Sequence, residues 1–524
     1  MNSSNKSPAS LWRPLRSATF RNLLIADVVS DVGTFMQTVG AAWLMVSLSA
    51  GPLYVALTQT ASALPYFVLA LPAGVIGDII DRRRVILFTE TWMLAVALVL
   101  AILTLAGLMS PVLLLVLTFV LSAGDAFETP TWRAVLPELV PKDDLPAASA
   151  LNGIEFNFAR AVGPALAGFV IAFTGVGAAF LINSASFFGV ILVVARWRRA
   201  VRKRTTPPET VTGATVAAIR YVRYSPGVRA VLVRAGAAMF FASGLLALLP
   251  SVAHRITKSP IGYGILLGCF GFGAVLGAMA MQRARARWSA DAVVSVGIAA
   301  FGLTTVAAGA LRSLAPLAAI MLMAGAAWIS FISLFNVQVL NQTPDWVRAR
   351  VLSVSMLVFQ GAVAAGSATW GAVASRTGID KALLWAGVGA ILSTILGYFL
   401  RLPDASVDLT PWNHWRLPAV DDASLNDGGP VLVTVEYRVD PEKAAEFIKT
   451  MHEYGRIRRR DGASRWGICR DLETADRYVE TFVVSSWAEH LRQHDRLTRA
   501  DSELEERLRG CTRTEPSVRH LVYL

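Results

Sequence analysis

The chain has 524 residues, of which 54% are hydrophobic and only 16% are charged, and its formal net charge is +12. Soluble domains carry about 25% charged residues, so a mean hydropathy of +0.51 indicates that most of this chain lies in lipid. The basic excess is therefore explained by membrane topology and anionic lipid headgroups, and nucleic-acid binding is not expected. Three cysteines, Cys269, Cys469 and Cys511, have the spacing of neither a metal site nor a disulfide framework.

Apolar runs of membrane length organise the chain up to residue 401. A helix needs about 20 apolar residues to cross the hydrocarbon core of a bilayer. Runs of this kind predict twelve membrane helices, near residues 20–48, 53–77, 85–108, 111–134, 147–173, 176–195, 228–253, 261–282, 290–311, 315–340, 351–374 and 382–401. A basic gap that contains Pro207-Pro208 divides them into six and six.

This division gives the predicted domains of the membrane part. We expect an N-terminal segment at 1–19, a six-helix bundle at 20–195, a linker at 196–227 and a second six-helix bundle at 228–401. Loops rich in arginine and lysine lie on the cytoplasmic side of a membrane. Basic residues are concentrated in the N-terminal segment, the linker and the loops after even-numbered helices, so both termini are predicted to be cytoplasmic. The second half has exceptions: Arg255, Lys258, Arg312, Arg376 and Lys381.

Beyond residue 401 the composition becomes that of a soluble domain. After a linker at 402–428, alternating valines predict a strand at 431–439, and Asp440-Pro441 has the pattern of a helix cap followed by a first-turn proline. Further strands are expected near 463–470, 477–485 and 517–523, with helices from 444 and over 487–509. The order β-α-β-β-α-β is ferredoxin-like, so we expect a small α+β domain at 429–524 in the cytoplasm.

A cluster of charges separates the second apolar run from the third. It reads Gly74-Val75-Ile76-Gly77-Asp78-Ile79-Ile80-Asp81-Arg82-Arg83-Arg84. So many charges cannot lie in hydrocarbon, so the cluster predicts a tight loop at the cytoplasmic surface. Glycine, then an acid, then a basic run is also the loop pattern of the major facilitator transporters.

The membrane part resembles the major facilitator superfamily, and within it the branch of the bacterial enterobactin exporter and the transmembrane secretion effectors. Besides the charged loop, the resemblance is carried by Asp125–Pro130, Val135–Val140, Ala150–Asn152, Asn157–Gly168, Gly262–Gly264 and Arg348–Ser353. It implies an all-α membrane protein with two six-helix halves, multi-pass in the bacterial inner membrane, that exports a drug or siderophore. The tail resembles the small antibiotic-biosynthesis monooxygenase-like domains.

The resemblance implies roles for two groups of residues. Gly74, Asp78 and Arg82 to Arg84 correspond to a gate in which the acid pairs with arginine and a helix N-terminus, although the loop could also be a simple topology anchor. Gly163, Pro164 and Gly168 resemble the fifth-helix motif of proton-coupled antiporters; a packing kink in lipid is the alternative.

Ionisable groups within the membrane are costly and are functional candidates by default. Asp27 and Asp31 share one face of the first helix, and Asp125 and Glu128 share a face of the fourth. We expect Asp31 and Glu128 to carry protons with Arg160 as their partner, and Asp27 and Glu155 to assist them, or else these groups form static ion pairs. Glu90, near the cytoplasmic end of the third helix, belongs to the same set.

Polar residues in several helices are candidates for substrate contact, although hydrogen bonds between helices would explain them equally well. They are Asn152, Asn157, Arg234, Asn336, Gln338 and Gln360. In the tail, His490 and His494 stand four residues apart, as metal-binding pairs on helices can, but no third ligand is apparent and solvated helix-face histidines are the preferred interpretation. Catalytic residues, a metal site, a cofactor and a P-loop for ATP are not expected.

These observations predict a proton-driven secondary transporter that exports a small amphipathic molecule by alternating access. Uptake or facilitated diffusion is the alternative within the class. An enzyme–transporter fusion, in which the tail modifies the exported metabolite, is the alternative from another class, and a sensor that has lost transport is a third. The expected partners are the small-molecule substrate, protons, the lipid bilayer and a second copy of the chain bound through the tail.

Overall fold

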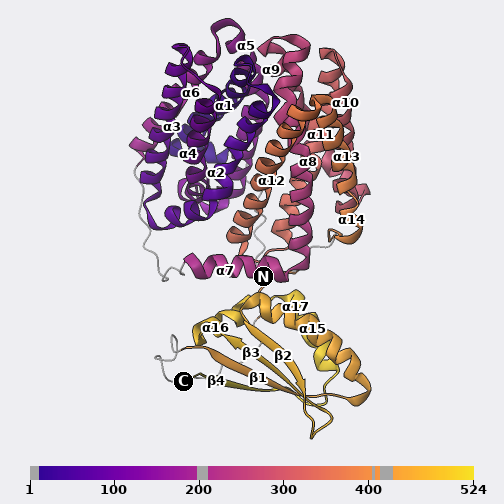
Figure 1. The fold of residues 1–524 in the computed structure, drawn as a ribbon. Helices are drawn as coiled ribbons and strands as arrows, with labels where there is room; N and C mark the ends of the chain where they lie inside the picture. Colours follow the sequence, from indigo (N-terminus) through magenta and orange to yellow (C-terminus); the bar gives the residue numbers. More distant parts are fainter. Residues whose placement is uncertain (1–10, 198–210, 404–407, 413–428, 524) are drawn as a thin grey trace. The chain divides into compact units, whose positions relative to one another are not determined.

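The computed structural model describes residues 11–197, 211–403, 408–412 and 429–523 (Figure 1). The chain divides into two compact units. The first unit comprises Met1–Thr206, Val233–Phe335 and Met356–Arg401; the second comprises Pro207–Leu232, Asn336–Ser355 and Leu402–Leu524. Most of the basic residues of the predicted linker at 196–227, and most of the linker at 402–428, lie outside the described residues.

Long helices account for the predicted apolar runs. Among the described residues, eleven spans are long and apolar enough to cross a membrane. They are formed by α1 (Ala18–Ser47), α3 (Arg82–Leu105), α4 (Pro111–Leu139), α5 (Leu145–Thr174), α6 (Val176–Arg196), α8 (Pro226–Thr257), α9 (Pro260–Arg287), α10 (Ala290–Ala310), α11 (Leu314–Asn341), α12 (Arg348–Thr377) and the pair α13 (Ile379–Ser393) and α14 (Leu396–Phe399).

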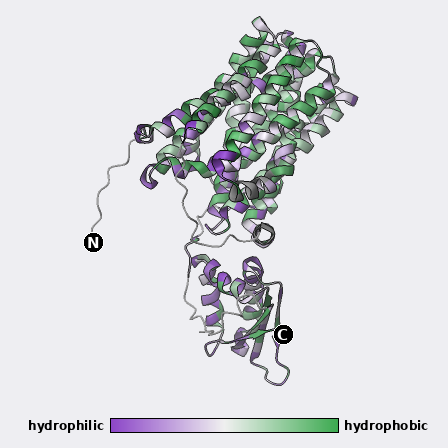
Figure 2. Cartoon of the chain, turned by 90° about the vertical axis from the view of Figure 1, so that its left-hand side faces the viewer, coloured by the Kyte–Doolittle hydropathy of each residue, from purple (hydrophilic) through white to green (hydrophobic). Residues whose placement is uncertain are grey.

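The second predicted run corresponds to α2 (Gly51–Ile79), which carries no charged residue from 51 to 77 and contains Pro65 and Pro72. With it, the predicted class of a helical membrane protein in two six-helix halves is confirmed. Figure 2 shows hydrophobic residues along these helices and many hydrophilic ones in the C-terminal domain.

The predicted loop at Gly74–Arg84 is much shorter in the structure than in the sequence analysis. Helix α2 continues to Ile79 and α3 begins at Arg82, so only Ile80 and Asp81 separate them. Asp81 is the N-cap of α3, and its side chain accepts a hydrogen bond from the Arg84 amide at 3.2 Å. The acid therefore satisfies an amide that the first helical turn leaves without an intrahelical partner.

The first six helices pack into one bundle. Helix α1 packs against α5 and α6, α2 against α4, and α3 against α6. The Ser17 hydroxyl, which caps α1, donates to the Leu139 carbonyl at the end of α4. The start of α1, the α2–α3 turn and the ends of α4 and α6 thus lie at the same end of this bundle, as their basic flanking residues predict.

Two of the basic residues that depart from the predicted charge bias are neutralised. Arg255 of α8 and Arg312, which follows α10, both bind the Asp380 carboxylate of α13 at 2.6 Å. Their charges therefore form a local ion-pair group, which explains why they carry little information about topology.

The predicted linker contains a helix that the sequence analysis missed. Helix α7 (Val211–Tyr224) ends one residue before α8 begins at Pro226. Ala217, Ala218 and Tyr221 are buried, whereas Val216 and Ile219 are exposed. Helix α7 is therefore amphipathic, with one face packed and the other open.

The C-terminal domain has the predicted order of strands and helices. It consists of β1 (Val431–Arg438), α15 (Ala444–Asp461), β2 (Arg465–Arg470), β3 (Arg477–Val484), α16 (Trp487–Arg496), α17 (Arg499–Gly510) and β4 (Ser517–Val522). The strands form an antiparallel sheet in the order β2-β3-β1-β4, which is the ferredoxin-like arrangement (Figure 1). Alternate residues of β1, from Val431 to Tyr437, point into the core with Phe447 and Tyr454 of α15.

Candidate functional site

Acidic side chains from four helices meet inside the first six-helix bundle. They are Asp27 and Asp31 of α1, Glu90 of α3, Asp125 and Glu128 of α4, and Glu155 of α5. Asp27 lies within electrostatic range of Asp31, Glu128 and Glu155. The structure therefore places together the acidic residues that were predicted to serve proton coupling, and Glu90 and Asp125 from the same set of candidates lie with them.

Asp31 and Glu155 form one pair of carboxyl groups. Their side chains lie within hydrogen-bonding range of each other, and the Arg160 guanidinium interacts electrostatically with Asp31. Glu155 is buried, and among the described residues its Oε1 atom has no hydrogen-bond donor. A hydrogen bond between two carboxyl groups requires a proton on one of them, and in this pair that hydrogen bond would lie close to the positive charge of Arg160.

Glu90 and Glu128 form a second pair. Their carboxyl groups are also within hydrogen-bonding range, and both residues are buried, with exposed fractions of 3% and 7%. The Thr89 hydroxyl donates to Glu128 Oε2 at 2.6 Å. Thr89 was not a predicted site residue, although a threonine directly before Glu90 could have suggested a local donor.

Asp125 is held by a tyrosine that the sequence analysis also missed. The Tyr66 hydroxyl of α2 donates to Asp125 Oδ2, and Thr129 of α4 contacts Oδ1 at 3.3 Å. Tyr66 stands in a long apolar run and follows Pro65. A hydroxyl in such a run must find a partner inside the protein, which is the signal that could have identified it.

The predicted gate residues contact helix ends of their own bundle. Arg82 binds the Ala134 carbonyl at 2.6 Å and Glu138 at 2.7 Å, and Arg83 binds the carbonyls of Val194 and Ala195 at the end of α6. Cations at helix C-termini are electrostatically favourable. Through these contacts Arg82 connects α3 to α4, and Arg83 connects α3 to α6.

The positions of the other predicted gate residues are known, but the structure gives less information about their contacts. Arg84 is exposed, and Gly74 and Asp78 lie in the last turns of α2. The side chain of Asp78 lies outside the described residues, so its predicted pairing with arginine stays a prediction.

The predicted kink residues lie where the two halves of the membrane part touch. Helix α5 packs along α9 of the second half. A Cβ atom on Gly264 would lie 2.8 Å from the Pro164 carbonyl oxygen and 3.0 Å from Gly168 Cα. Gly163 faces Phe35 of α1 in the same way, at 2.7 Å. The motif therefore permits close backbone contact between α5 and two of its neighbours.

The polar residues proposed for substrate contact are dispersed. Asn152 and Gln360 are half-buried, and Asn336 is exposed. Asn157 is exposed and donates to the Gly153 carbonyl of its own helix, and buried Gln338 donates to the Pro403 carbonyl. Their role in substrate contact stays a prediction.

The guanidinium group of Arg234 is bound by other groups of the protein. It is 2% exposed and binds Asp291 of α10, the Ser295 hydroxyl at 3.0 Å and the Leu400 carbonyl at 3.2 Å. Its donors are thus directed at α10 and the end of α14, and the acidic cluster lies in the other half of the chain.

The tail histidines were predicted to be solvated, and this was wrong for His490, which is 2% exposed. Its Nε2 atom lies 3.0 Å from Nε2 of His520 on β4 and 3.2 Å from Nε2 of His494. Burial, together with the charges of His494, His520 and Arg458, lowers the pKa of His490 to about 3, and burial lowers the pKa of His520. His490 is therefore neutral at physiological pH. Within the described part of the chain, no group of three or more His, Cys, Asp or Glu side chains has a metal-binding arrangement.

The interior of the tail is occupied by a buried ion pair. Glu480 of β3 is fully buried and accepts hydrogen bonds from Arg458 at 3.2 Å, Trp466 at 2.8 Å and Tyr437 at 3.0 Å. Burial and the neighbouring Glu480 charge raise the pKa of Tyr437, so its hydroxyl remains a donor. This ion pair connects α15 to β3, and removal of one partner would leave an uncompensated buried charge.

Twelve membrane-length helices in two halves, with buried carboxyl pairs inside one half, define a membrane transporter of the major facilitator type. The family model of the transmembrane secretion effectors matches residues 9–524, so the chain belongs to that family.

Two characterised relatives match most of their own length. The chain is 22% identical over 381 residues to the staphyloferrin A transporter of Staphylococcus aureus, covering 71% of this chain and 93% of the relative. It is 24% identical over 398 residues to the multidrug efflux pump Tap of Mycolicibacterium fortuitum, covering 72% and 94%.

Solved structures show the same fold at low identity. A bacterial homologue of the human lysosomal transporter Spinster, inward-facing and occupied, matches with a TM-score of 0.60 at 14% identity, over 74% of this chain and 97% of that one. A POT family transporter in complex with 5-aminolevulinic acid matches with a TM-score of 0.61 at 12% identity, over 73% and 96%.

Proposed function

We propose that the protein exports a small amphipathic molecule from the cytoplasm in exchange for protons, by alternating access. The observation that carries the proposal is the pairing of buried carboxyl groups, Asp31 with Glu155 and Glu90 with Glu128. Each pair binds a proton in a region from which water is largely excluded. Release of such a proton is the step that a proton-driven transporter must couple to movement of its cargo.

Arg160 gives this site a means of coupling. Its guanidinium interacts with Asp31 and also lies 4.9 Å from the centre of the Phe156 ring. A positive charge near a carboxyl group favours its ionised form. A cargo that displaces or engages Arg160 would change the proton affinity of Asp31, so binding of cargo and of protons would be linked.

The relatives support a direction of transport and a chemical class of cargo. Among the named relatives, one is a siderophore transporter and one a multidrug efflux pump, which supports export of a drug-like or siderophore-like molecule. Uptake or facilitated diffusion is the alternative. We place the protein in the bacterial inner membrane with both termini in the cytoplasm, supported by the basic residues Arg82 to Arg84 and Arg196 at one end of the first bundle.

We assign the gate and the cargo wall as the sequence analysis does. Gly74 and Asp78 with Arg82 to Arg84 would close the cytoplasmic side. The residues that would contact cargo are Asn152, Asn157, Arg234, Asn336, Gln338 and Gln360. The tail, 429–524, is proposed to act without catalysis, because Arg458, Glu480 and Trp466 occupy its interior. A homodimer through the tail remains part of the proposal. Product formation from a metabolite by the full chain would instead favour an enzyme–transporter fusion.

The double variant Asp31→Asn with Glu128→Gln tests the proposal. In cells that express the protein, efflux should be lost in the double variant and should also stop when a protonophore collapses the proton gradient. Asp345→Asn is a matched control, because this carboxylate is exposed beside Arg348 and far along the chain from the cluster. Efflux that persists in the double variant and with the protonophore would contradict proton coupling.

A further inference from the structure

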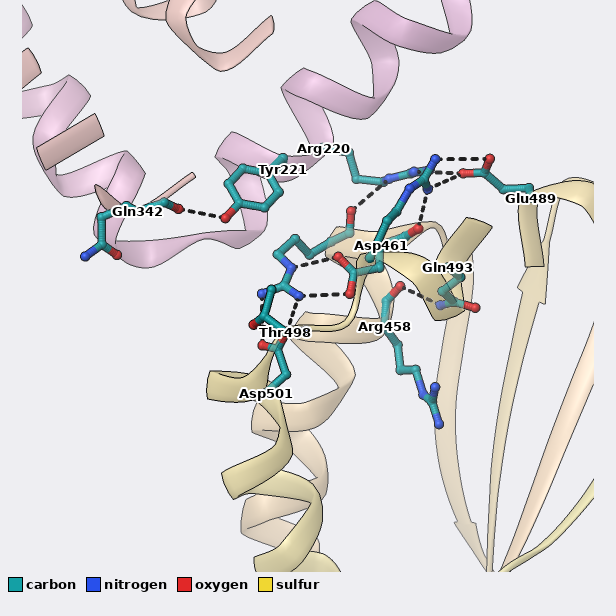
Figure 3. A network of polar contacts seen from close by, with 11 residues as sticks. Arg220, Tyr221, Gln342, Arg458, Asp461, Glu489, Gln493, Thr498 and Asp501 are labelled. Atoms are coloured by element: carbon teal, nitrogen blue, oxygen red, sulfur yellow. Dashed lines mark hydrogen bonds and ion pairs between the residues drawn. The ribbon is translucent and has the colours of Figure 1, made fainter. Parts of the chain in front are cut away.

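Helix α7 packs against the C-terminal domain. Both belong to the second compact unit, and α7 contacts α15. The buried face of α7 includes Ala217, Ala218 and Tyr221. Figure 3 shows Arg220 of α7 extending toward Glu489 of the tail, while the Tyr221 hydroxyl points to Gln342. The connection between the two halves is thus bound to the domain at the other end of the chain.

A chain of charged contacts begins at Arg220. Its guanidinium binds Glu489 of α16 at 3.2 Å and the Arg460 carbonyl at 3.2 Å (Figure 3). Glu489 also binds Arg496 at 2.6 Å. Burial opposes ionisation of Glu489, but Arg496, Arg492 and Arg220 outweigh it and lower its pKa, so the carboxylate stays charged at neutral pH. Arg220 therefore meets a partly buried, permanently ionised partner.

A third segment enters the same contact. Gln342 and Trp346 lie between α11 and α12. The Tyr221 hydroxyl donates to the Gln342 carbonyl at 2.7 Å, and the Tyr221 and Trp346 rings meet edge to face with centroids 5.8 Å apart. The Arg496 guanidinium lies 4.5 Å from the centre of the Trp346 ring. The C-terminal domain thus binds α7 and the α11–α12 connection at once.

The arginines of the tail that contact these segments are also held by other groups within the tail. Arg460 binds Asp461 and Asp501, at 2.8 and 2.7 Å, and lies 5.7 Å from the Tyr221 ring. Arg496 also donates to the Asp461 carbonyl at 2.6 Å. Because the guanidinium groups are already ordered by the tail itself, little side-chain entropy is lost when they contact Tyr221 and Trp346. This face of the tail, formed by Arg460, Glu489 and Arg496, is an organised docking surface.

We propose that the C-terminal domain is an intramolecular latch, which holds α7 and the α11–α12 connection together and stabilises one conformation of the transport cycle. Helix α7 lies in the segment that joins the two halves, so contacts that fix α7 restrict how the halves can rock against each other. Contacts that exist in only one of these states favour that state by their full interaction free energy. The expected effect of the latch on the efflux rate rests on the proposed transport function. The docking of the C-terminal domain on α7 and the α11–α12 connection does not depend on it.

Hydrogen exchange of the full chain in lipid nanodiscs tests docking directly. Arg220→Gln should raise the exchange rate of α7 amides at 216–224 about fivefold or more, while amides of β1 and β3 keep their protection. Arg492→Gln is the matched control: it also contacts Glu489, at 2.9 Å, but is 46% exposed. Adding Arg220→Gln to Glu489→Gln should raise the exchange rate of α7 little further, because Glu489→Gln already removes the ion pair.

The variants compared by hydrogen exchange should then be tested in an efflux assay. This assay separates the latch proposal from the proposed transport function. Arg220→Gln should change the efflux rate at least twofold, with Arg492→Gln unchanged. Unaltered α7 exchange in Arg220→Gln would overturn the latch, whatever the transport result. Faster α7 exchange with unchanged efflux would show docking without regulation and would also overturn it. A wild-type chain that docks normally but moves no cargo would instead contradict the proposed transport function.

Discussion

The Thr89 hydroxyl of α3 lies 2.6 Å from Glu128 Oε2 of α4, inside the first six-helix bundle. It supplies one neutral donor to a carboxyl group whose other neighbour is the Glu90 carboxyl. Glu128 is thus contacted by a hydroxyl group and by a second carboxyl group where α3 meets α4. The same principle applies to Asp31 and Glu155 between α1 and α5.

Infrared spectroscopy of the purified protein should detect these protons. We expect a C=O stretch of protonated, buried carboxyl groups at neutral pH, because each carboxyl pair needs one proton for its hydrogen bond. Glu128→Gln should remove part of this band and Thr89→Val should shift it, since the donor to Glu128 is lost. Thr91→Val, in which an exposed hydroxyl bonds only within its own helix turn, is the control and should leave the band unchanged. Absence of the band in the wild type would contradict paired carboxyl protons.

The close contact of α5 with α9 should tolerate no side chain at Gly264. Gly264→Ala places a Cβ atom 2.8 Å from the Pro164 carbonyl oxygen, so the backbones must separate. Overpacking of this kind costs about 1–3 kcal/mol, and we expect a lower melting temperature and slower transport. Gly268→Ala, one turn along α9, meets its nearest atom only at 3.8 Å and should behave like the wild type. Equal melting temperatures for the two variants would be inconsistent with this packing.

Arg83 should stabilise the first bundle, and Arg84 should not. Arg83→Gln removes hydrogen bonds to the carbonyls of Val194 at 3.0 Å and Ala195 at 2.6 Å. Hydrogen bonds to charged groups are worth about 1.5–3 kcal/mol, and the lower end applies near solvent. Thermal unfolding in detergent should show a fall of several degrees for Arg83→Gln and little change for exposed Arg84→Gln. A larger effect at Arg84 would show that the loop acts chiefly through its exposed charge.

The C-terminal domain should lose stability in acid. His490 has an ordinary pKa of 6.5 in the unfolded chain and a pKa of about 3 when buried. Above pH 6.5, His490 is neutral in both the folded and the unfolded chain, so its protonation does not reduce the free energy of unfolding. Between pH 6.5 and 3 the unfolded chain binds a proton that the folded domain does not, so the free energy of unfolding falls by up to about 1.4 kcal/mol per pH unit.

Thermal proteolysis of the tail in the full chain, at pH 7 and pH 5, measures this effect. His490→Gln should reduce the difference between the two pH values, even if it lowers stability overall. His452→Gln is the control, because His452 is exposed on α15. A wild-type tail equally resistant at both pH values would show that His490 is charged in the folded domain.

The sequence predicted the helices and the tail because both depend on periodic burial. Apolar runs of membrane length and the alternating valines of β1 are local patterns, and the structure has helices and strands close to each expected range. Asp27, Asp31, Glu128 and Glu155 were recognisable because charges in apolar helices are rare.

Contacts between residues distant in sequence could not be predicted. His520 contacts His490 only because β4 joins the sheet beside β1. Tyr66 reaches Asp125 through the packing of α2 on α4. Helix α7 lies in a basic, proline-containing gap, and its buried face is completed by α15 and by Gln342, which no local pattern reveals. The role of Asp81 as the N-cap of α3 depends on where α2 ends, which the charged cluster alone does not reveal.

Proton-driven export of a small molecule can be tested by comparing the metabolites inside and outside cells. Untargeted mass spectrometry should be applied to cells that express the wild type or the variant Asp31→Asn with Glu128→Gln, each with and without a protonophore. We expect at least one small amphipathic molecule to be found in the medium only with the wild type. When the proton gradient is collapsed, this molecule should be found inside the cells instead. Identical distributions in all four conditions would contradict it.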